Sequence, residues 1–333
     1  MRASKLAVLV AIALAFVPFS RDNEAIAGQS APEPRRVKAI RVQILSTMLA
    51  DAGIGEWGFA ALVEVDGKRI LFDTGARPET VLQNAREMKV DLASITDVIL
   101  SHNHGDHTIG LMTLRRELAK QNPAALSRAH VGRGIFWSRP TRDGGESNHV
   151  ARIKAEYEAT GGKFIEYDKP AEIAPGVWLT GPVPRVHPER NWGLGGVGGQ
   201  LRNAAGAMAE DTIPEDMSLV MDTAEGLVLI SGCGHAGIIN TIEHARASVR
   251  KAPVHSAIGG FHLLIADDAK LNWTADKLKE FGLGSLMGAH CTGIEAVYRI
   301  RERAGLDRAR VVVGAVGATF TLGKGFDPRA LAR

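Results

Sequence analysis

The chain has 333 residues, of which 45% are hydrophobic and 23% are charged, and its formal net charge at pH 7 is +3. Because the positive excess is so small, we predict no binding to nucleic acid or to an anionic membrane surface. The length is sufficient for one large α/β domain or two modest ones.

The N-terminus is organised like a secretory signal peptide. A short basic segment, Met1–Lys5, precedes the apolar run Leu6–Phe19, and Ala25-Ile26-Ala27 offers a small-residue cleavage pattern. The apolar run is shorter than the roughly 20 residues that a membrane-spanning helix needs. We therefore predict that residues 1–27 are a signal peptide, that the protein is exported to a bacterial periplasm, and that the mature chain has no stable membrane association. An uncleaved N-terminal anchor is the alternative.

A proline-rich lead, residues 28–38, is followed by apolar and amphipathic segments that alternate without a linker-like gap. We therefore expect one domain of α/β or α+β class over residues 39–325. Apolar runs predict strands at Ala39–Leu45, Phe59–Val65, Arg69–Phe72, Val98–Leu100, Phe164–Tyr167, Val177–Thr180, Leu219–Asp222, Leu227–Ser231, Val254–Ile258 and Ser285–Ala289. Helical periodicity predicts helices at Arg77–Met88, His107–Lys120, Ile238–Ser248, Trp273–Phe281 and Gly293–Arg303.

Two segments look irregular. Five glycines occur in residues 191–199, inside an insertion near residues 190–215, and no phosphate-loop pattern accompanies them. We predict a flexible lid or surface insertion there, with a phosphate-binding loop as the alternative. In the second segment, Gly132–His149, aromatic residues stand beside Arg139 and Arg142. It would either line the pocket of an anionic, ring-bearing substrate or form a packed loop, and both interpretations stay open.

Four metal-ligating side chains follow the predicted strand that ends at Leu100: His102, His104, Asp106 and His107. Imidazole nitrogen and carboxylate oxygen are ligands that zinc and related divalent metals prefer. His102 and His104 point the same way in an extended segment, so they can bind one ion together. Gly105 lets the chain turn, so that the next two ligands serve a second ion. Because the whole chain has only 11 histidines, a chance cluster explains this loop poorly.

Three further histidines stand at the ends of later predicted strands, in turns bounded by glycine: His235, His262 and His290. Because each occupies the same place relative to its strand, we expect them to reach one shared site.

These motifs resemble the metallo-β-lactamase superfamily. The order Ser-His-x-His-x-Asp-His, Gly-Cys-x-His-x-Gly, Gly-Gly-x-His-Leu and His-Cys-Thr-Gly is similar in particular to its branch of 7,8-dihydropterin-6-methyl-4-(β-D-ribofuranosyl)-aminobenzene-5′-phosphate synthases. The resemblance extends from about Val42 to Phe320. It implies an αββα sandwich, two β-rich halves with helices on their outer faces.

The resemblance also implies two divalent metal ions, zinc in the first place and manganese or iron as alternatives. It assigns the first ion to His102 and His104, and the second to Asp106, His107 and His290. The sequence departs from the family pattern at one place, because Cys233 stands where most superfamily members have a bridging aspartate. We predict His235 as the additional ligand, and Cys233 and Asp216 are the alternatives. Asp73 matches a strand-end aspartate that would orient a ligand histidine.

The only two cysteines, Cys233 and Cys291, both adjoin motif histidines. In an exported protein a disulfide is the ordinary interpretation. Ligation of a metal by Cys233 competes with it, since thiolate binds zinc strongly. Two free thiols are the third interpretation, and all three stay open.

Divalent metals lower the pKa of bound water from 15.7 to about 7, so the site would provide an activated water at neutral pH. We predict a hydrolase of a small, anionic ester, phosphoester or lactone-like substrate. Asp106 would serve as ligand and general base, and His262 as an acid/base or substrate-facing residue, unless it is satisfied within the core. The predicted substrate-binding residues are Arg185, Thr292 and Gly293, the last two through backbone N–H groups at a helix start.

Two other functions remain as alternatives. One is the transferase activity of the synthase branch, which joins a pterin to an aminobenzene ribotide. The other is a non-catalytic protein that binds a metal or ligand.

Overall fold

The computed structural model describes residues 35–191 and 199–332. The predicted signal peptide, most of the proline-rich lead and the glycine-rich residues 192–198 lie outside the described residues, and those predictions stay predictions. From Arg35 onward the chain forms one compact unit. No helix within the described ranges is both long and apolar enough to span a membrane.

Eight strands of the described chain form a first sheet in the order β17-β16-β1-β2-β3-β4-β5-β6. Its strands β1 to β3 are antiparallel, whereas β3, β4, β5 and β6 are parallel neighbours. The bounds are β17 Gly325–Asp327, β16 Thr319–Thr321, β1 Ile40–Ser46, β2 Ala60–Val65, β3 Lys68–Phe72, β4 Asp97–Leu100, β5 Arg128–Gly132 and β6 Lys163–Tyr167.

A second sheet of seven described strands has the order β15-β14-β13-β12-β11-β8-β7. Here β12, β13, β14 and β15 are parallel, and β11, β8 and β7 continue antiparallel. The bounds are β15 Val311–Val313, β14 Leu286–Gly288, β13 Val254–Gly259, β12 Gly226–Ser231, β11 Leu219–Thr223, β8 Val177–Leu179 and β7 Ala171–Ala174. A separate hairpin pairs β9 Gln200–Arg202 with β10 Met208–Glu210.

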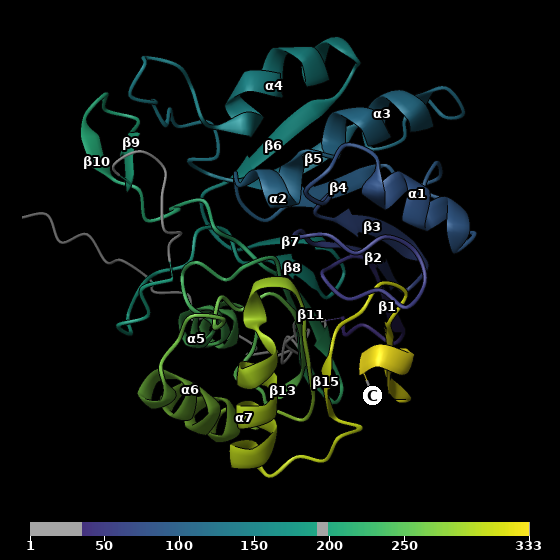
Figure 1. The fold of residues 1–333 in the computed structure, drawn as a ribbon, viewed down its shortest axis with the longest axis vertical. Coiled ribbons are helices and arrows are strands. Elements are labelled where there is room, and N and C mark those ends of the chain that lie inside the picture. Colours follow the sequence, from purple (N-terminus) through teal and green to yellow (C-terminus); the bar gives the residue numbers. More distant parts are fainter. Residues whose placement is uncertain (1–34, 192–198, 333) are drawn as a thin grey trace, which may run out of the picture. The chain divides into compact units, whose positions relative to one another are not determined.

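Helices cover the outer face of each sheet (Figure 1). The helices α1 Thr80–Glu87, α2 Gly105–Thr108, α3 Leu111–Ala119 and α4 His149–Ala159 accompany the first sheet. The second sheet carries α5 Ile238–Ser248, α6 Asp268–Glu280 and α7 Ile294–Ala304. Within the described ranges, short 3₁₀ turns occupy His290–Thr292 and Ala330–Ala332.

Three hydrophobic cores explain why these layers stack. Alternate residues of β2 face opposite ways, so that Ala61 and Val63 join a core between the two sheets while Leu62 joins a core beneath α1, α3 and α4. A third core lies between the second sheet and α5, α6 and α7. This arrangement confirms the predicted αββα sandwich.

Several predicted elements differ from the structure. The expected helix at residues 107–120 is divided into α2 and α3, and Gly110 between them lies so close to Thr74 that a Cβ would be 2.0 Å from its carbonyl oxygen. Helix α6 begins five residues before the predicted Trp273, because Asp267 caps it by accepting the Lys270 N–H at 2.8 Å. Helix α4 and the strands β5, β7, β9, β10 and β15 to β17 were not predicted.

Candidate metal centre

The loops that carry the predicted ligands meet because they follow parallel strands. In the first sheet β3 and β4 run the same way, and in the second sheet β12, β13 and β14 do so. The carboxyl ends of parallel strands lie at one edge of a sheet, which places their following loops together. One loop follows β4 with three histidines and Asp106, and His235, His262 and His290 follow β12, β13 and β14 in turn.

The first group of ligands consists of His102, His104 and His235, whose ligand atoms all lie within 4.8 Å of one another. The Nε2 atoms of His102 and His235 are 3.2 Å apart. The His104 ring centroid is 4.7 Å from that of His102 and 4.8 Å from that of His235. His235, the ligand that sequence reasoning assigned only against rivals, therefore lies beside the two histidines of the β4 loop.

The second group consists of Asp106, His107 and His290, also within 4.8 Å of one another. Asp106 Oδ2 is 3.2 Å from Nε2 of His290 and 3.9 Å from Nε2 of His107. The Asp106 side chain is 22% exposed, whereas both imidazoles are buried. Solvent therefore reaches this group through the Asp106 carboxylate.

Hydrogen bonds to Nδ1 fix how two of the ligand imidazoles in the cluster are protonated. His235 Nδ1 faces the carbonyl oxygen of Asn191, so it must carry a proton and donate. His107 Nδ1 donates to Asp73 Oδ2 at 2.7 Å. In the neutral form of both rings the proton on Nδ1 leaves the lone pair on Nε2, the atom that points into the cluster.

His102 reaches the same state through Ser101. The Ser101 hydroxyl donates its one proton to Asp73 Oδ2 at 2.8 Å, so its oxygen accepts from His102 Nδ1 at 2.9 Å. The Nε2 lone pairs of His102 and His235 thus face each other across 3.2 Å. Two facing lone pairs repel unless a cation lies between or beside them, so this donor set fits a divalent metal.

Burial keeps the first group neutral. Desolvation, followed by repulsion from neighbouring imidazoles, holds the pKa of His102 and of His235 well below the usual value. Desolvation also lowers the pKa of His104 to about 4. At neutral pH these three rings therefore offer uncharged nitrogen donors.

The second group attracts positive charge. Burial opposes protonation of His107, but the carboxylates of Asp73 and Asp106 outweigh it and raise the His107 pKa to about 9. Burial likewise opposes ionisation of Asp106, and His107 and His290 outweigh it, so the pKa of Asp106 lies below its usual range. A metal ion at this place would replace the second imidazole proton.

His290 and His262 both adopt left-handed backbone conformations, with φ of 46° and 48°. Non-glycine residues there are strained, and such strain is often found at functional sites. Among the described residues Nδ1 of His290 and Nδ1 of His262 have no hydrogen-bond partner, whereas Nε2 of His290 lies 3.2 Å from the carboxylate of Asp106. The half-buried His262 ring lies 4.8 Å from that of His235, which places it at the margin of the first group.

The rivals for the additional ligand have different surroundings. Asp216 lies in no group of clustered ligand atoms among the described residues, and its Oδ2 accepts the Ala236 N–H at 2.9 Å. It thereby supports the turn that carries His235. Cys233 and Cys291 are both free thiols, with their sulfur atoms 3.2 Å apart.

The predicted substrate contacts are placed less favourably. Thr292 is buried, its hydroxyl donates to Gly259 O at 2.9 Å, and its backbone N–H donates to Ala289 O at 3.0 Å. Neither group is available to an anion, which corrects the expectation for Thr292. Gly293 directly precedes α7 at φ 80°. Arg185 directs its guanidinium to the backbone carbonyl groups of Thr212 and Ile213, in the loop before Asp216.

Sequence reasoning missed a buried ion-pair network behind the metal loop. Arg139 donates to Asp211 Oδ2 at 2.6 Å and to Glu215 Oε2 at 2.9 Å. Glu215 Oε1 in turn accepts from the side chain of Asn103 at 2.6 Å, between two ligand histidines. Phe136 stacks edge-on against Phe164 at 5.0 Å. The segment that includes Arg139 is thus a packed loop that supports the ligands, and no local motif signals this role.

Trp57 was also missed. Its ring lies 4.9 Å from that of His290, and the residue is 48% exposed. Trp57 belongs to no recognisable sequence motif. It lies in the loop that precedes β2, and the fold places this loop beside His290. An exposed indole beside a ligand histidine forms part of the wall of the site.

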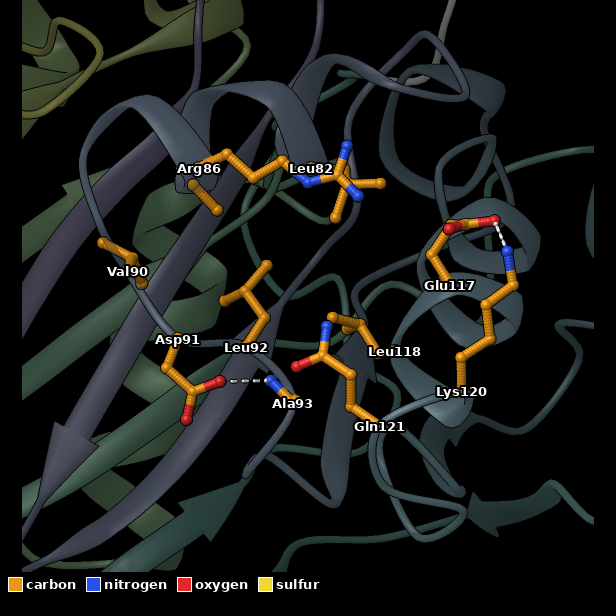
Figure 2. Close-up of a pocket in the computed structure, with 11 residues that line it drawn as sticks. Leu82, Arg86, Val90, Asp91, Leu92, Ala93, Glu117, Leu118, Lys120 and Gln121 are labelled. Atoms are coloured by element: carbon orange, nitrogen blue, oxygen red, sulfur yellow. Dashed lines mark hydrogen bonds and ion pairs between the residues drawn. The ribbon is translucent and has the colours of Figure 1, made fainter.

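A surface hollow elsewhere does not belong to this centre. A cavity of about 270 Å³ lies beside α1 and α3, with Leu82, Arg86, Leu118 and Gln121 in its wall (Figure 2). Its lining shares no residue with either group of ligands. In its wall the Lys120 ammonium donates to Glu117 Oε1 at 2.6 Å.

Comparisons with known proteins give one superfamily. The sequence profile described as "Metallo-beta-lactamase superfamily" matches residues 58–200. A 7,8-dihydropterin-6-methyl-4-(beta-D-ribofuranosyl)-aminobenzene-5′-phosphate synthase of Methanocaldococcus jannaschii is 29% identical over 292 residues, which cover 84% of this chain and 97% of that protein.

Two solved structures resemble this fold. Tm1679, described as a metal-dependent hydrolase of the beta-lactamase superfamily, has a TM-score of 0.66 and 27% identity, covering 84% of this chain and 98% of its own. The metallo-beta-lactamase fold protein YhfI of Bacillus subtilis has a TM-score of 0.54 and 14% identity, covering 85% of this chain and 100% of its own, and indicates the fold alone.

Proposed function

Because the chain belongs to the metallo-beta-lactamase superfamily, we propose that it is a metal-dependent hydrolase with a site for two divalent ions, zinc before manganese or iron. Its substrate would be a small, anionic molecule with an ester, phosphoester or lactone-like bond. The observation that carries the proposal is the pair of facing lone pairs on His102 and His235, 3.2 Å apart. Such a contact is unfavourable without a cation, and a second group with a carboxylate adjoins it.

The residues divide the work between holding metal and moving protons. His102, His104 and His235 would hold one ion, and Asp106, His107 and His290 the other. Bound divalent ions supply two things, a lowered water pKa of roughly 7 and polarisation of the electrophilic group. The anionic character proposed for the substrate follows from this concentration of positive charge.

Proton transfer would fall to Asp106 and His262. Burial would raise the pKa of Asp106, but His107 and His290 outweigh burial and hold that pKa below its usual range. Asp106 is therefore ionised at neutral pH, and its carboxylate is partly exposed. It is therefore placed to accept a proton. Burial would lower the pKa of His262, but the neighbouring Cys291 outweighs burial and raises it. A half-buried imidazole with this shift is suited to give a proton to a leaving group.

The first experiment is elemental analysis of the purified protein. Wild type should hold two equivalents of metal, and His102→Ala/His290→Ala should lose both. His244→Ala is the matched control, because this half-buried histidine on α5 interacts with Thr180 O and belongs to neither group of ligands. Hydrolysis of an ester, phosphoester and lactone panel should follow metal content across the three proteins. Wild type without metal even after reconstitution would contradict the proposal and favour a ligand-binding protein.

A transferase is the second candidate, supported by the 29% identity to the M. jannaschii synthase over 97% of that protein. Hydrolysis and group transfer need the same electrophilic activation, so metal analysis does not separate them. The metal-loaded protein should therefore be given a dihydropterin and a ribofuranosyl-aminobenzene phosphate in parallel with the ester panel. Formation of a conjugate by mass spectrometry, with no hydrolysis of the panel, would favour the transferase.

We also propose export, on the basis of the basic and apolar segments within residues 1–27. The mass of the mature protein, expressed with its full N-terminus in a bacterium, should correspond to a chain that begins at residue 28. A full-length chain that stays in the cytosol would contradict export and would strengthen the transferase.

A further inference from the structure

Cys233 occupies the space between the two groups of ligands. Its sulfur lies 3.1 Å from Nε2 of His107, a member of the second group. The ligand atoms of Cys233, His107 and His102 all lie within 4.8 Å of one another, and His102 belongs to the first group. The residue is 2% exposed. One buried sulfur is thus within reach of both metal positions.

The backbone before Cys233 is shaped to bring this sulfur inward. A Cβ at Gly232 would lie 2.1 Å from Ser101 Oγ and 2.6 Å from Asp73 Oδ2. Only glycine lets the end of β12 approach the network that orients His102 and His107. The same close approach places the next side chain, Cys233, against the imidazoles themselves.

We propose that Cys233 is a thiolate ligand shared by the two metal ions, an inference that rests on the dinuclear site of the proposed function. On binding, the S–H bond breaks, the proton passes to solvent, and the sulfur lone pairs form bonds to both ions. Asp106 is the only carboxylate in the two groups, so the thiolate adds a second negative charge where two divalent ions meet. Zinc and cobalt bind sulfur better than magnesium or manganese, so the centre selects zinc-like metals.

Cys291 is the natural comparison. It is equally buried, with its sulfur 3.2 Å from that of Cys233, but among the described residues it groups only with Cys233 and His262. Its sulfur therefore lies beside the bridging position and reaches no ligand of either metal group except through Cys233. The two cysteines provide a matched pair of variants with the same chemistry and burial.

The experiment uses the full chain, reduced and stripped of metal, titrated with Co²⁺ under anaerobic conditions. Wild type and Cys291→Ser should develop the near-ultraviolet charge-transfer band of a thiolate bound to cobalt. Cys233→Ser and Cys233→Asp should lose that band, and Cys233→Asp should still bind two equivalents of metal because a carboxylate can bridge. A band that survives in Cys233→Ser, or disappears only in Cys291→Ser, would overturn the assignment.

X-ray absorption of the zinc-loaded protein tests the bridge without any cysteine variant that fails to fold. A shared sulfur gives one sulfur neighbour per zinc at about 2.3 Å, whereas a sulfur bound to a single ion gives half of one on average. Two bound zinc ions without sulfur neighbours would refute the inference and leave the proposed hydrolase intact. A Cys233–Cys291 disulfide in the metal-loaded protein would also refute it. Absence of metal binding in every protein would refute both.

Discussion

Replacement of Asp73 by asparagine would test how the ligand imidazoles are oriented. Asp73 is buried directly after β3, with a left-handed φ of 57° that asparagine tolerates. Its Oδ1 accepts from the backbone N–H of Ser101 at 2.7 Å, and its Oδ2 accepts from the Ser101 hydroxyl at 2.8 Å and from His107 Nδ1 at 2.7 Å. An asparagine can keep the first contact, but its NH₂ group then faces two donors.

The size of the effect follows from these contacts. With a donor opposite Nδ1, the favoured His107 tautomer moves its proton to Nε2, the atom that should bind metal. A hydrogen bond to a charged group contributes about 1.5–3 kcal/mol. Loss of such an orienting partner weakens metal binding by roughly 10- to 100-fold, and each tenfold corresponds to about 1.4 kcal/mol. The two ranges agree, so we expect the second metal to bind 10- to 100-fold more weakly.

Chelator competition, with metal counted at each step, measures this loss. The matched control is Asp97→Asn, because Asp97 is also buried and also accepts from a histidine, His130 Nε2 at 2.8 Å, but lies at the opposite end of β4. The control should keep both metal affinities. Unchanged affinity in Asp73→Asn, or equal losses in both variants, would refute the orienting role.

Three further predictions concern stability. Burial would raise the pKa of Asp97, but hydrogen bonds from His130 and Arg128 outweigh burial and hold that pKa far below its usual value. The ionised Asp97 therefore stabilises the fold fully above the unfolded pKa of about 3.9, and this stabilisation is lost as the pH falls below that value. Urea unfolding should show wild type losing more stability than Asp97→Asn as the pH falls from about 5 to about 3, a range that spans the unfolded pKa, and parallel curves would contradict this. Glu215→Gln should lower the free energy of unfolding by about 1.5–3 kcal/mol, since Arg139 keeps Asp211 as a partner, and a neutral effect would mean the pair is not structural. Gly232→Ala should cost about 1–3 kcal/mol from overpacking and also lose metal, and a variant with full metal content would show that the β12 turn can move.

The sequence was sufficient for the ligand loop after β4 because the information there is local. A β-branched strand that ends in a cluster of histidines has few structural solutions, and the turns with His235 and His290 repeat that arrangement. The parallel strands β12, β13 and β14 of the second sheet were likewise predictable, since buried parallel strands form nearly continuous apolar runs. The sandwich itself came from the resemblance, because periodicity does not specify how two sheets pack.

The remaining features depend on contacts between distant segments. Arg139 and Glu215 are 76 positions apart, and Asn103 joins them only in the folded chain. The role of Gly232 likewise becomes visible only when Asp73 and Ser101 arrive from the other sheet. Thr292 was misjudged because its place before a helix suggests free N–H groups, whereas its own N–H already donates to Ala289 O.

We expect the choice between hydrolysis and transfer to depend on residues outside the two groups of ligands. A protein described as a hydrolase and another described as a synthase both match more than four-fifths of this chain, so similarity to them does not distinguish the two reactions. Such residues would line the surface that receives the substrate. In this chain the exposed indole of Trp57 beside His290 and the half-buried His262 beside His235 stand at that surface. The indole favours a ring-bearing substrate by stacking, and the imidazole can move a proton, so these two side chains rather than the ligands would determine the reaction.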